Sequence, residues 1–307
     1  MVLTPGVAAI QYWKPTLVPY LWWVSCYFAL ACGVIAHNHN HCPTFKTKQQ
    51  NQLFGMWISI FYGYPTFAWI PTHNLNHHKL VNKAGDATIT WRYTNRHILP
   101  VAITYFFVSS WFQSDPIKEF IRKARTEKPA LYRQIIEQYA AVIGAHLLLL
   151  SLAIWMHGWK TGLFTWALVS GLPGFFALFT IMLFNYEQHV HTDPWSEHAH
   201  SRSFNGALTN FFLFNNGYHA VHHEHPGTHW SKLKELHLAI EKEIPPQLLE
   251  RSLFWYWFRQ YVLAPFFPSL GTVQYGRAPF DPPGGAAVAL VTDSVGIGEA
   301  GTNAARV

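Results

Sequence analysis

Three segments of this chain are long, apolar and free of Asp, Glu, Lys and Arg, and they limit the folds available to it. They are Leu17–Ala36, Tyr139–Met156 and Leu163–Phe184. A helix of about 20 apolar residues spans the hydrocarbon core of a bilayer. Only 12% of the 307 residues are charged, whereas a soluble domain carries about 25%. The sequence therefore predicts an all-α integral membrane domain with three spans.

The remaining segments are predicted to lie at the membrane surface or in water. Leu53–Ile70 is interrupted by glycine and proline, and Ile98–Phe112 is short, so we expect both to lie on the membrane or to re-enter it. Ser114–Gln138 is charged and predicts a separate helix in water or at the interface, and Ser252–Leu270 predicts an interfacial helix. We expect a catalytic domain over residues 1–270 and a flexible tail over residues 271–307, because the tail is rich in Gly, Ala and Pro.

Histidines gather where the apolar segments end. Of 19 histidines, 15 lie in clusters. Six lie in the two segments His37–His41 and His73–His78. The other nine lie in Asn185–His229, in one part around His189 and a second part around His222. If these clusters build one site, they lie on one side of the membrane. On that topology only Lys14 and Lys160 lie on the opposite side, so the positive-inside rule predicts that the clusters face the cytoplasm.

The spacing within the clusters suits metal binding. Histidines three or four residues apart share one face of a helix, and paired imidazoles on one face bind metal ions. Nine histidines fit this description and would saturate two ions: His37, His41, His73, His77, His78, His189, His219, His222 and His223. Imidazole suits iron, copper, zinc and nickel alike, so spacing alone leaves the metal open. Four nearby carboxylates are predicted to orient the rings: Asp86, Glu187, Asp193 and Glu224.

Isolated histidines call for a different interpretation. We expect His97, His157 and His237 to be polar anchors at the membrane interface, and His146, in the middle of a span, to have either a functional or a helix-packing role. The formal charge of +6 is spread along the chain, whereas a nucleic-acid-binding protein concentrates its basic residues. No nucleic-acid partner is therefore expected, and the basic residues suit anionic lipid headgroups.

The set of motifs H-x3-H, H-x3-HH and H-x2-HH, in this order around apolar segments, resembles the membrane fatty acid desaturase family, which belongs to a desaturase/hydroxylase superfamily. The resemblance runs from about Leu17 to Trp230. It implies a helical membrane domain with a cytosolic cap that holds two iron ions. The implied reaction is the O2-dependent removal of two hydrogens from a fatty acyl chain. The first box is His37 and His41, the second His73, His77 and His78, and the third His219, His222 and His223.

The resemblance also implies two ligands outside the boxes. Some members of the family place a histidine at the end of the last span and an asparagine four residues earlier that binds iron through a water, and His189 and Asn185 match this pair. The chain departs from the pattern at its start, because many members have two spans before the first box and only one is predicted here.

Further expectations concern the substrate and the partners. The resemblance implies a fatty acyl lipid, acyl-CoA or acyl-ACP substrate and a ferredoxin or cytochrome-type electron donor, in the inner membrane of a cell. Basic residues on the predicted cytoplasmic side could meet an acidic donor or simply face lipid: Lys79, Lys83, Arg92 and Arg202. Six aromatic residues could line a substrate channel or form an interfacial belt: Trp22, Trp23, Trp57, Tyr62, Phe67 and Trp69.

Two alternatives stay open. An acyl-chain hydroxylase or a carotenoid ketolase or hydroxylase would use the same scaffold, because these reactions share the first hydrogen abstraction with desaturation. A non-enzymatic metal-binding or metal-transporting membrane protein is a more distant alternative. Transporters place their ligands near the middle of the membrane, whereas these clusters follow the ends of the predicted spans.

Overall fold

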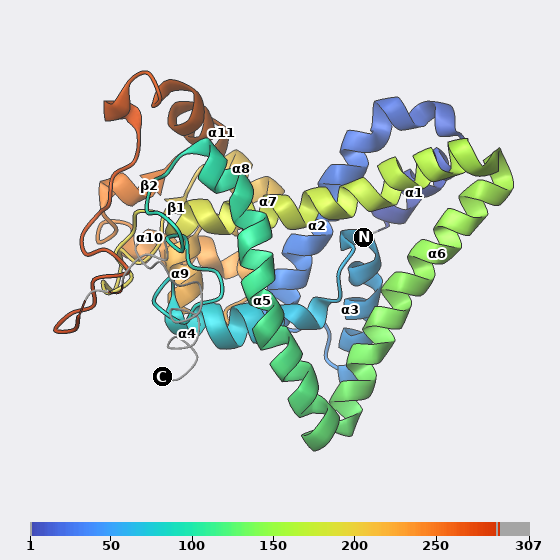
Figure 1. The fold of residues 1–307 in the computed structure, drawn as a ribbon, viewed down its shortest axis with the longest axis horizontal. Helices are drawn as coiled ribbons and strands as arrows, with labels where there is room; N and C mark the ends of the chain where they lie inside the picture. The colour runs from blue at the N-terminus through green and yellow to red at the C-terminus, as the bar shows by residue number, and fades with distance from the viewer. Residues whose placement is uncertain (1, 287, 289–307) are drawn as a thin grey trace. The chain divides into compact units, whose positions relative to one another are not determined.

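The computed structural model describes residues 2–286 and 288, and these residues are almost entirely helical (Figure 1). The predicted all-α class is confirmed. The helices of three turns or more are α1 (Leu3–Trp13), α2 (Val18–His41), α3 (Lys48–Tyr62), α5 (Leu99–Glu127), α6 (Pro129–Trp166) and α7 (Leu172–His189). The shorter α-helices are α4 (His78–Leu80), α8 (Ala207–Phe212), α9 (His219–Glu224), α10 (Leu233–Ile240) and α11 (Leu253–Phe258).

Other short elements connect these helices. The π-helices are η3 (Ile70–His77), η4 (Ala167–Gly171) and η7 (Arg259–Leu263). The 3₁₀ turns are η1 (Pro15–Leu17), η2 (Thr66–Ala68), η5 (Trp230–Lys232), η6 (Pro246–Leu248) and η8 (Pro268–Leu270). The strands β1 (Ser203–Phe204) and β2 (Leu249–Glu250) form one parallel pair.

The chain divides into two compact units, and α5 and α7 contribute residues to both. Unit 1 contains the described residues up to Ile70 together with Ile117–Ile181, and unit 2 contains Pro71–Pro116 and the described residues from Met182 onward. Each unit has its own buried apolar clusters.

In unit 1, α3 packs between α2 and α6 (Figure 1). Small side chains such as Ala29, Cys32 and Ala36 on α2 meet Ile58 and Tyr62 on α3 in a buried cluster, and small residues let helices approach closely. The ends of α3 are defined locally. The Thr47 hydroxyl accepts a hydrogen bond from Gln50 N at the start, and Gly63 ends the helix in the left-handed region with a φ of 81°.

Two helical stretches are long and apolar enough to cross a membrane, Pro15–His41 and Pro129–His189. The second contains both of the later predicted spans, and it is broken at Gly158, whose φ of 75° and ψ of 165° are not helical. The chain reverses direction there. As a result, Gly162 lies so close to the backbone of Ile154, eight residues earlier, that a side chain at position 162 would collide with it. Glycine at position 162 therefore permits the close approach that follows the break at Gly158.

Two predicted boundaries are wrong. The apolar segment up to Phe112 and the charged segment after it form one continuous helix, α5, with Pro116 inside it. The next helix, α6, begins at Pro129, so only Lys128 separates it from α5. Sequence polarity changes at position 114, but polarity does not end a helix. The charged half is stabilised by local pairs between Glu119 and both Arg122 (2.7 Å) and Lys123 (3.3 Å).

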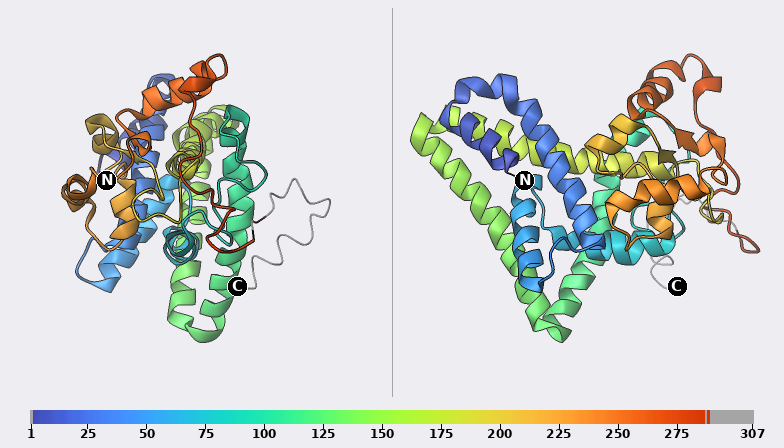
Figure 2. Two further views of the ribbon diagram at one scale, coloured as in Figure 1. Left: turned by 90° about the vertical axis from the view of Figure 1, so that its left-hand side faces the viewer. Right: turned by 180° about the vertical axis from the view of Figure 1, so that it is seen from behind.

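In unit 2, the strand pair anchors a set of short helices. Phe204 N donates to Gly217 O (2.8 Å), and Asn205 N donates to Glu250 O (2.9 Å), so β1 links α9 to the segment before α11. A side chain at position 217 would collide with Phe204 O, which explains a glycine directly before the third histidine box. The helices α9 and α10 lie side by side (Figure 2).

The start of the predicted tail packs against unit 2. Tyr275 N donates to His191 O (3.1 Å), Gln274 Nε2 donates to Thr192 O (2.8 Å), and Arg277 N donates to Asp193 Oδ2 (2.9 Å). The ring of Phe280 lies 5.6 Å from that of Trp91. Residues 272–281 therefore belong to the folded part of the chain, whereas residues 287 and 289–307 of the predicted tail lie outside the described residues.

These contacts predict the result of two truncations. A chain that ends after Gly271 loses the hydrogen bonds to residues 191–193, and each such bond contributes about 1 kcal/mol. We expect the free energy of unfolding to fall by roughly 3 kcal/mol or more, measured as a lower thermal midpoint in detergent. A chain that ends after Gly285 is the control and should keep the full-length midpoint. Equal midpoints for the two truncations would contradict the packing role.

Candidate metal centre

Four histidine rings converge in unit 2, and we call them the His77 group: His77, His189, His219 and His223. The Nε2 atom of His189 lies 3.0 Å from that of His77, 2.9 Å from that of His219 and 3.2 Å from that of His223. His219 and His223 have their Nε2 atoms 3.1 Å apart. These residues come from η3, the end of α7 and the short helix α9.

This geometry fits a metal ion. Two ligands at right angles around an ion, each about 2.1 Å from it, lie about 3.0 Å apart, which is close to the observed separations. A neutral imidazole has one donor and one acceptor nitrogen, so four Nε2 atoms cannot all satisfy one another through hydrogen bonds. A cation at their centre would accept a lone pair from each.

His77 is oriented by a carboxylate. Its Nδ1–H donates to Asp86 Oδ2 (2.8 Å), and Thr88 Oγ1, which donates to Asp86 Oδ1 (2.7 Å), lies 3.0 Å from the same ring nitrogen. Burial raises the pKa of Asp86, but the charge and hydrogen bond of His77 and the bonds from Thr88 outweigh it and hold that pKa below its usual range. The proton therefore stays on Nδ1 of His77, and Nε2 presents its lone pair to the site.

A strained turn supports this arrangement. Val81 and Asn82 lie in the left-handed region, with φ values of 45° and 63°, which is unusual for a β-branched residue such as valine. Asn82 N donates to Asp86 Oδ2 (2.8 Å), and Asn82 Nδ2 donates to His189 O (3.0 Å). The strained turn thus joins the carboxylate behind His77 to the backbone of His189.

The surroundings of His189 and His223 also favour metal binding. His189 Nδ1–H donates to His200 O (3.3 Å), which directs Nε2 toward the other histidines. Burial lowers the pKa of His223 well below its usual value, and the neighbouring His78 and His219 lower it further. His223 is therefore neutral near pH 7, the state in which imidazole binds a metal.

A second set of histidines, which we call the His78 set, lies beside the first: His73, His78 and His222. The Nε2 atom of His78 is 3.1 Å from that of His73 and 3.0 Å from that of His222. His73 and His78 are five residues apart and face the same way because Ile70–His77 is a π-helix. The prediction that the second box lies on an α-helix is therefore wrong.

Each box in unit 2 serves both sets. The π-helix gives His77 to one and His73 to the other, and α9 gives His219 and His223 to one and His222 to the other. The spacing alone had suggested that His219 pairs with His222. On α9 the residues four apart, His219 and His223, are the pair whose nitrogens meet.

The remaining predicted ligands are His37, His41 and Asn185, and each is described within its own unit. In unit 1, His37 and His41 near the end of α2 have ring centroids 4.8 Å apart, and Trp69 lies 5.2 Å from His37. In unit 2, Asn185 lies one turn before His189 on α7, and its Nδ2 donates to the hydroxyl of Tyr105 (3.0 Å). A role for Asn185 as a ligand through water stays a prediction.

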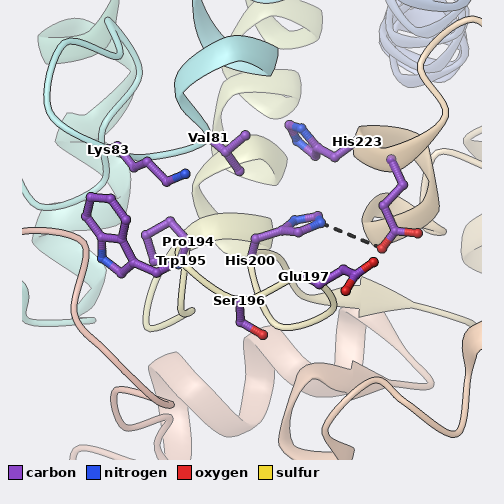
Figure 3. Close-up of a pocket in the computed structure, with 9 residues that line it drawn as sticks. Val81, Lys83, Pro194, Trp195, Ser196, Glu197, His200 and His223 are labelled. Atoms are coloured by element: carbon purple, nitrogen blue, oxygen red, sulfur yellow. Dashed lines mark ion pairs between the residues drawn. The ribbon is translucent and has the colours of Figure 1, made fainter. Parts of the chain in front are cut away.

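An open cavity of about 380 Å³ reaches the His77 group at His223 (Figure 3). Its lining is mostly polar and includes Lys83, Glu197, His200 and Glu224. The Lys83 ammonium lies 4.9 Å from the ring of Trp195, and His200 Nε2 lies 3.9 Å from Glu224 Oε1. This lining suits water or a polar partner better than an alkyl chain.

Of the four predicted carboxylates, the structure pairs Asp86 with a predicted ligand, and that prediction is confirmed. Glu187 instead contacts His97 (2.9 Å) and accepts a hydrogen bond from Tyr261. Asp193 accepts from the backbone of Trp195 (2.9 Å), and Glu224 contacts His198 (3.0 Å). Thr88 and Asn82, which help to hold the site, were not predicted, although Thr88 follows Asp86 by two residues and such pairs commonly form local hydrogen bonds.

Other predictions about single residues need correction. Arg202 is 1% exposed and cannot meet a partner protein, and Arg92 stacks on Phe112 at 3.5 Å. His97 and His237 are buried rather than interfacial. His146 Nε2 contacts Ile60 O (3.0 Å), which supports the helix-packing role.

The six aromatic residues differ in exposure. Tyr62 and Phe67 are buried and Trp69 is partly buried, whereas Trp22, Trp23 and Trp57 are exposed, as expected for an interfacial belt.

The helices and the site define a class: a helical protein with two stretches long and apolar enough to cross a membrane and with clustered histidines that could hold a metal ion. The comparison with known families is more specific, because the fatty acid desaturase family profile matches residues 13–255. The chain belongs to the fatty acid desaturase family. No curated protein matches it, and no solved structure does.

The hydrogen bond between His77 and Asp86 predicts the effect of Asp86→Asn. The change removes the charge that holds the proton on Nδ1, and losses of this kind cost about 10- to 100-fold in metal affinity. Titration of the metal-free protein with Co2+ measures this affinity. Asp193→Asn is the matched control, because Asp193 accepts from backbone N–H groups. Wild-type affinity in Asp86→Asn would contradict the orienting role.

Proposed function

We propose that this protein is a membrane di-iron oxidoreductase that introduces a double bond into a fatty acyl chain, using O2 and two external electrons. The observation that carries the proposal is the convergence of four Nε2 atoms in the His77 group, within a chain of the fatty acid desaturase family. Imidazole ligands alone are compatible with several metals, so iron is inferred from the family.

The reaction explains why such a centre is required. An alkyl C–H bond is not acidic, so general acid–base groups cannot break it, and protein side chains lack the redox chemistry. Bound iron would supply one-electron chemistry with O2. In the balanced reaction, the acyl chain loses two hydrogens, O2 is reduced to two waters, and two electrons and two protons are taken up from outside.

The proposed ligand sets follow from the geometry within unit 2 and from the family motifs. The His77 group would hold one ion through its four Nε2 atoms. The His78 set would hold the second ion. From the family motifs alone, we propose that His37 and His41 are also metal ligands and that Asn185 contributes through a water.

The protein's own part in the reaction is to orient the metal ligands and to exclude water from the centre. Asp86 and Thr88 keep the proton on Nδ1 of His77, so that Nε2 remains a ligand throughout turnover. His77 and His189 are fully buried, which limits water around the centre. The polar cavity beside His223 offers one side for exchange of water.

The partners are proposed from the same reaction. The substrate would be a fatty acyl lipid, acyl-CoA or acyl-ACP, and a ferredoxin or cytochrome-type donor would supply electrons. We place the centre on the cytoplasmic side of an inner membrane. Of the basic residues considered for donor docking, Lys79 is exposed and Lys83 lines the open cavity, so these two are the better candidates.

Lipid profiling of a host that expresses the protein tests the reaction. We expect a product two hydrogens lighter than its precursor by mass spectrometry. His77→Ala and His222→Ala should each lower product formation at least about 100-fold, because a lost ligand costs no less than a lost orienting partner. His225→Ala is the control, since His225 is exposed and belongs to neither set.

The outcomes separate the alternatives. A product that gains one oxygen would indicate a hydroxylase or ketolase on the same scaffold. Unchanged product in both His77→Ala and His222→Ala would refute the site.

Metal analysis provides an independent test. Purified protein reconstituted without oxygen should bind about two iron ions per chain, one for each set of histidines. Chelation followed by the addition of iron should restore activity. A single zinc ion that iron does not displace would instead favour a non-catalytic metal-binding protein.

A further inference from the structure

The largest fully buried side chain among the described residues is an arginine, and the proposed reaction does not use it. Arg202 is 1% exposed and lies in unit 2, just before β1. A buried guanidinium is costly unless polar groups surround it. Its contacts therefore show what the fold gains from a charge in this position.

Arg202 holds the end of α7, the helix that carries His189. Its Nη1 donates to Glu187 O (2.6 Å) and to Val190 O (3.1 Å), and its backbone N donates to Gln188 O (2.7 Å). The last carbonyl groups of a helix have no partner within it, and a cation near them is favoured by the helix dipole. One residue thus satisfies three carbonyl groups that surround position 189.

The loop that ends at Arg202 holds His189 itself. His200 O accepts from His189 Nδ1 (3.3 Å), and Thr192 Oγ1 donates to His189 O (2.8 Å) and lies 3.1 Å from His200 O. The ring and the backbone of His189 are therefore both fixed by residues 192–202. His189 is also the ring whose Nε2 lies within 3.2 Å of three others in the His77 group.

From these contacts we propose that Arg202 is a positioning residue for the metal ligand His189. The guanidinium bridges the carbonyl groups of Glu187 and Val190 and so sets the direction in which the His189 ring leaves the helix. Both side-chain bonds come from the two N–H groups of one planar nitrogen, Nη1. A lysine would keep the charge, but its rotating tetrahedral ammonium lacks this fixed planar geometry. This inference rests on the proposed metal site and adds a residue that the histidine motifs do not contain.

A Co2+ titration of the full-length, metal-free protein tests the proposal. We expect Arg202→Lys to weaken Co2+ binding at one of the two sets about 10- to 100-fold and to change the visible absorption of that Co2+. Binding at the other set should keep wild-type affinity. The absorption spectrum reports the ligand geometry directly, which a general loss of stability would not alter selectively.

Arg259→Lys is the matched control. The Arg259 guanidinium lies 5.6 Å from the ring of Tyr256, close to the 5.2 Å of Arg202, but it pairs with Glu250 rather than with α7. It should bind both Co2+ ions as the wild type does. The comparison separates the loss of an arginine beside this ring from the loss of the α7 contacts.

The outcomes are distinct from those of the proposed function. Wild-type Co2+ affinity and spectrum in folded Arg202→Lys overturn the positioning role and leave the enzyme proposal standing. Failure of the wild-type protein to bind Co2+ or Fe2+ would instead refute the proposed function. If Arg202→Lys does not fold, Thr192→Val decides, because it removes the hydrogen bond from the same loop to His189 O: weaker binding supports the proposal, and unchanged binding overturns it.

Discussion

The mutual approach of imidazole nitrogens is the constraint on which unit 2 depends. The Nε2 atom of His189 lies about 3 Å from those of His77 and His219 in a buried site. Nitrogens this close cannot all be paired by hydrogen bonds among themselves, and a bound cation would satisfy them. Much of the surrounding chain directs these rings. Asp86 orients the ring of His77. The strained turn at Val81 and the loop that ends at Arg202 both hold His189 or the backbone next to it.

These supports follow one physical pattern. His77 and His189 each present Nε2 to the centre because Nδ1 is bonded to an acceptor behind the ring, a carboxylate for His77 and a backbone carbonyl for His189. A carboxylate makes its imidazole a stronger electron donor than a carbonyl does. The electron density supplied by the ligands is therefore uneven around the proposed ion, and the residues behind the rings determine it.

The sequence predicted the kinds of residue in the site better than their arrangement. Long uncharged segments indicated the helical membrane class, and paired histidines indicated metal ligands, because both features depend only on residue type and spacing. The sharing of each box between two sets could not be predicted, because it depends on the π-helix of Ile70–His77 and on the direction of α9. The roles of Thr88, Asn82 and Arg202 depend on contacts across 11 to 107 residues of sequence in the folded chain, which local patterns do not record.

The sharing of short helices between the two sets has a consequence for how the centre tolerates change. On α9 neighbouring residues, His222 and His223, belong to different sets, and successive residues on a helix differ by about 100° in direction. One insertion or deletion within this helix would turn every ring away from its partners and abolish both ion positions together. The spacing of the two proposed ions thus depends on this one short helix, and neither position can be altered by shifting the helix while the other is preserved.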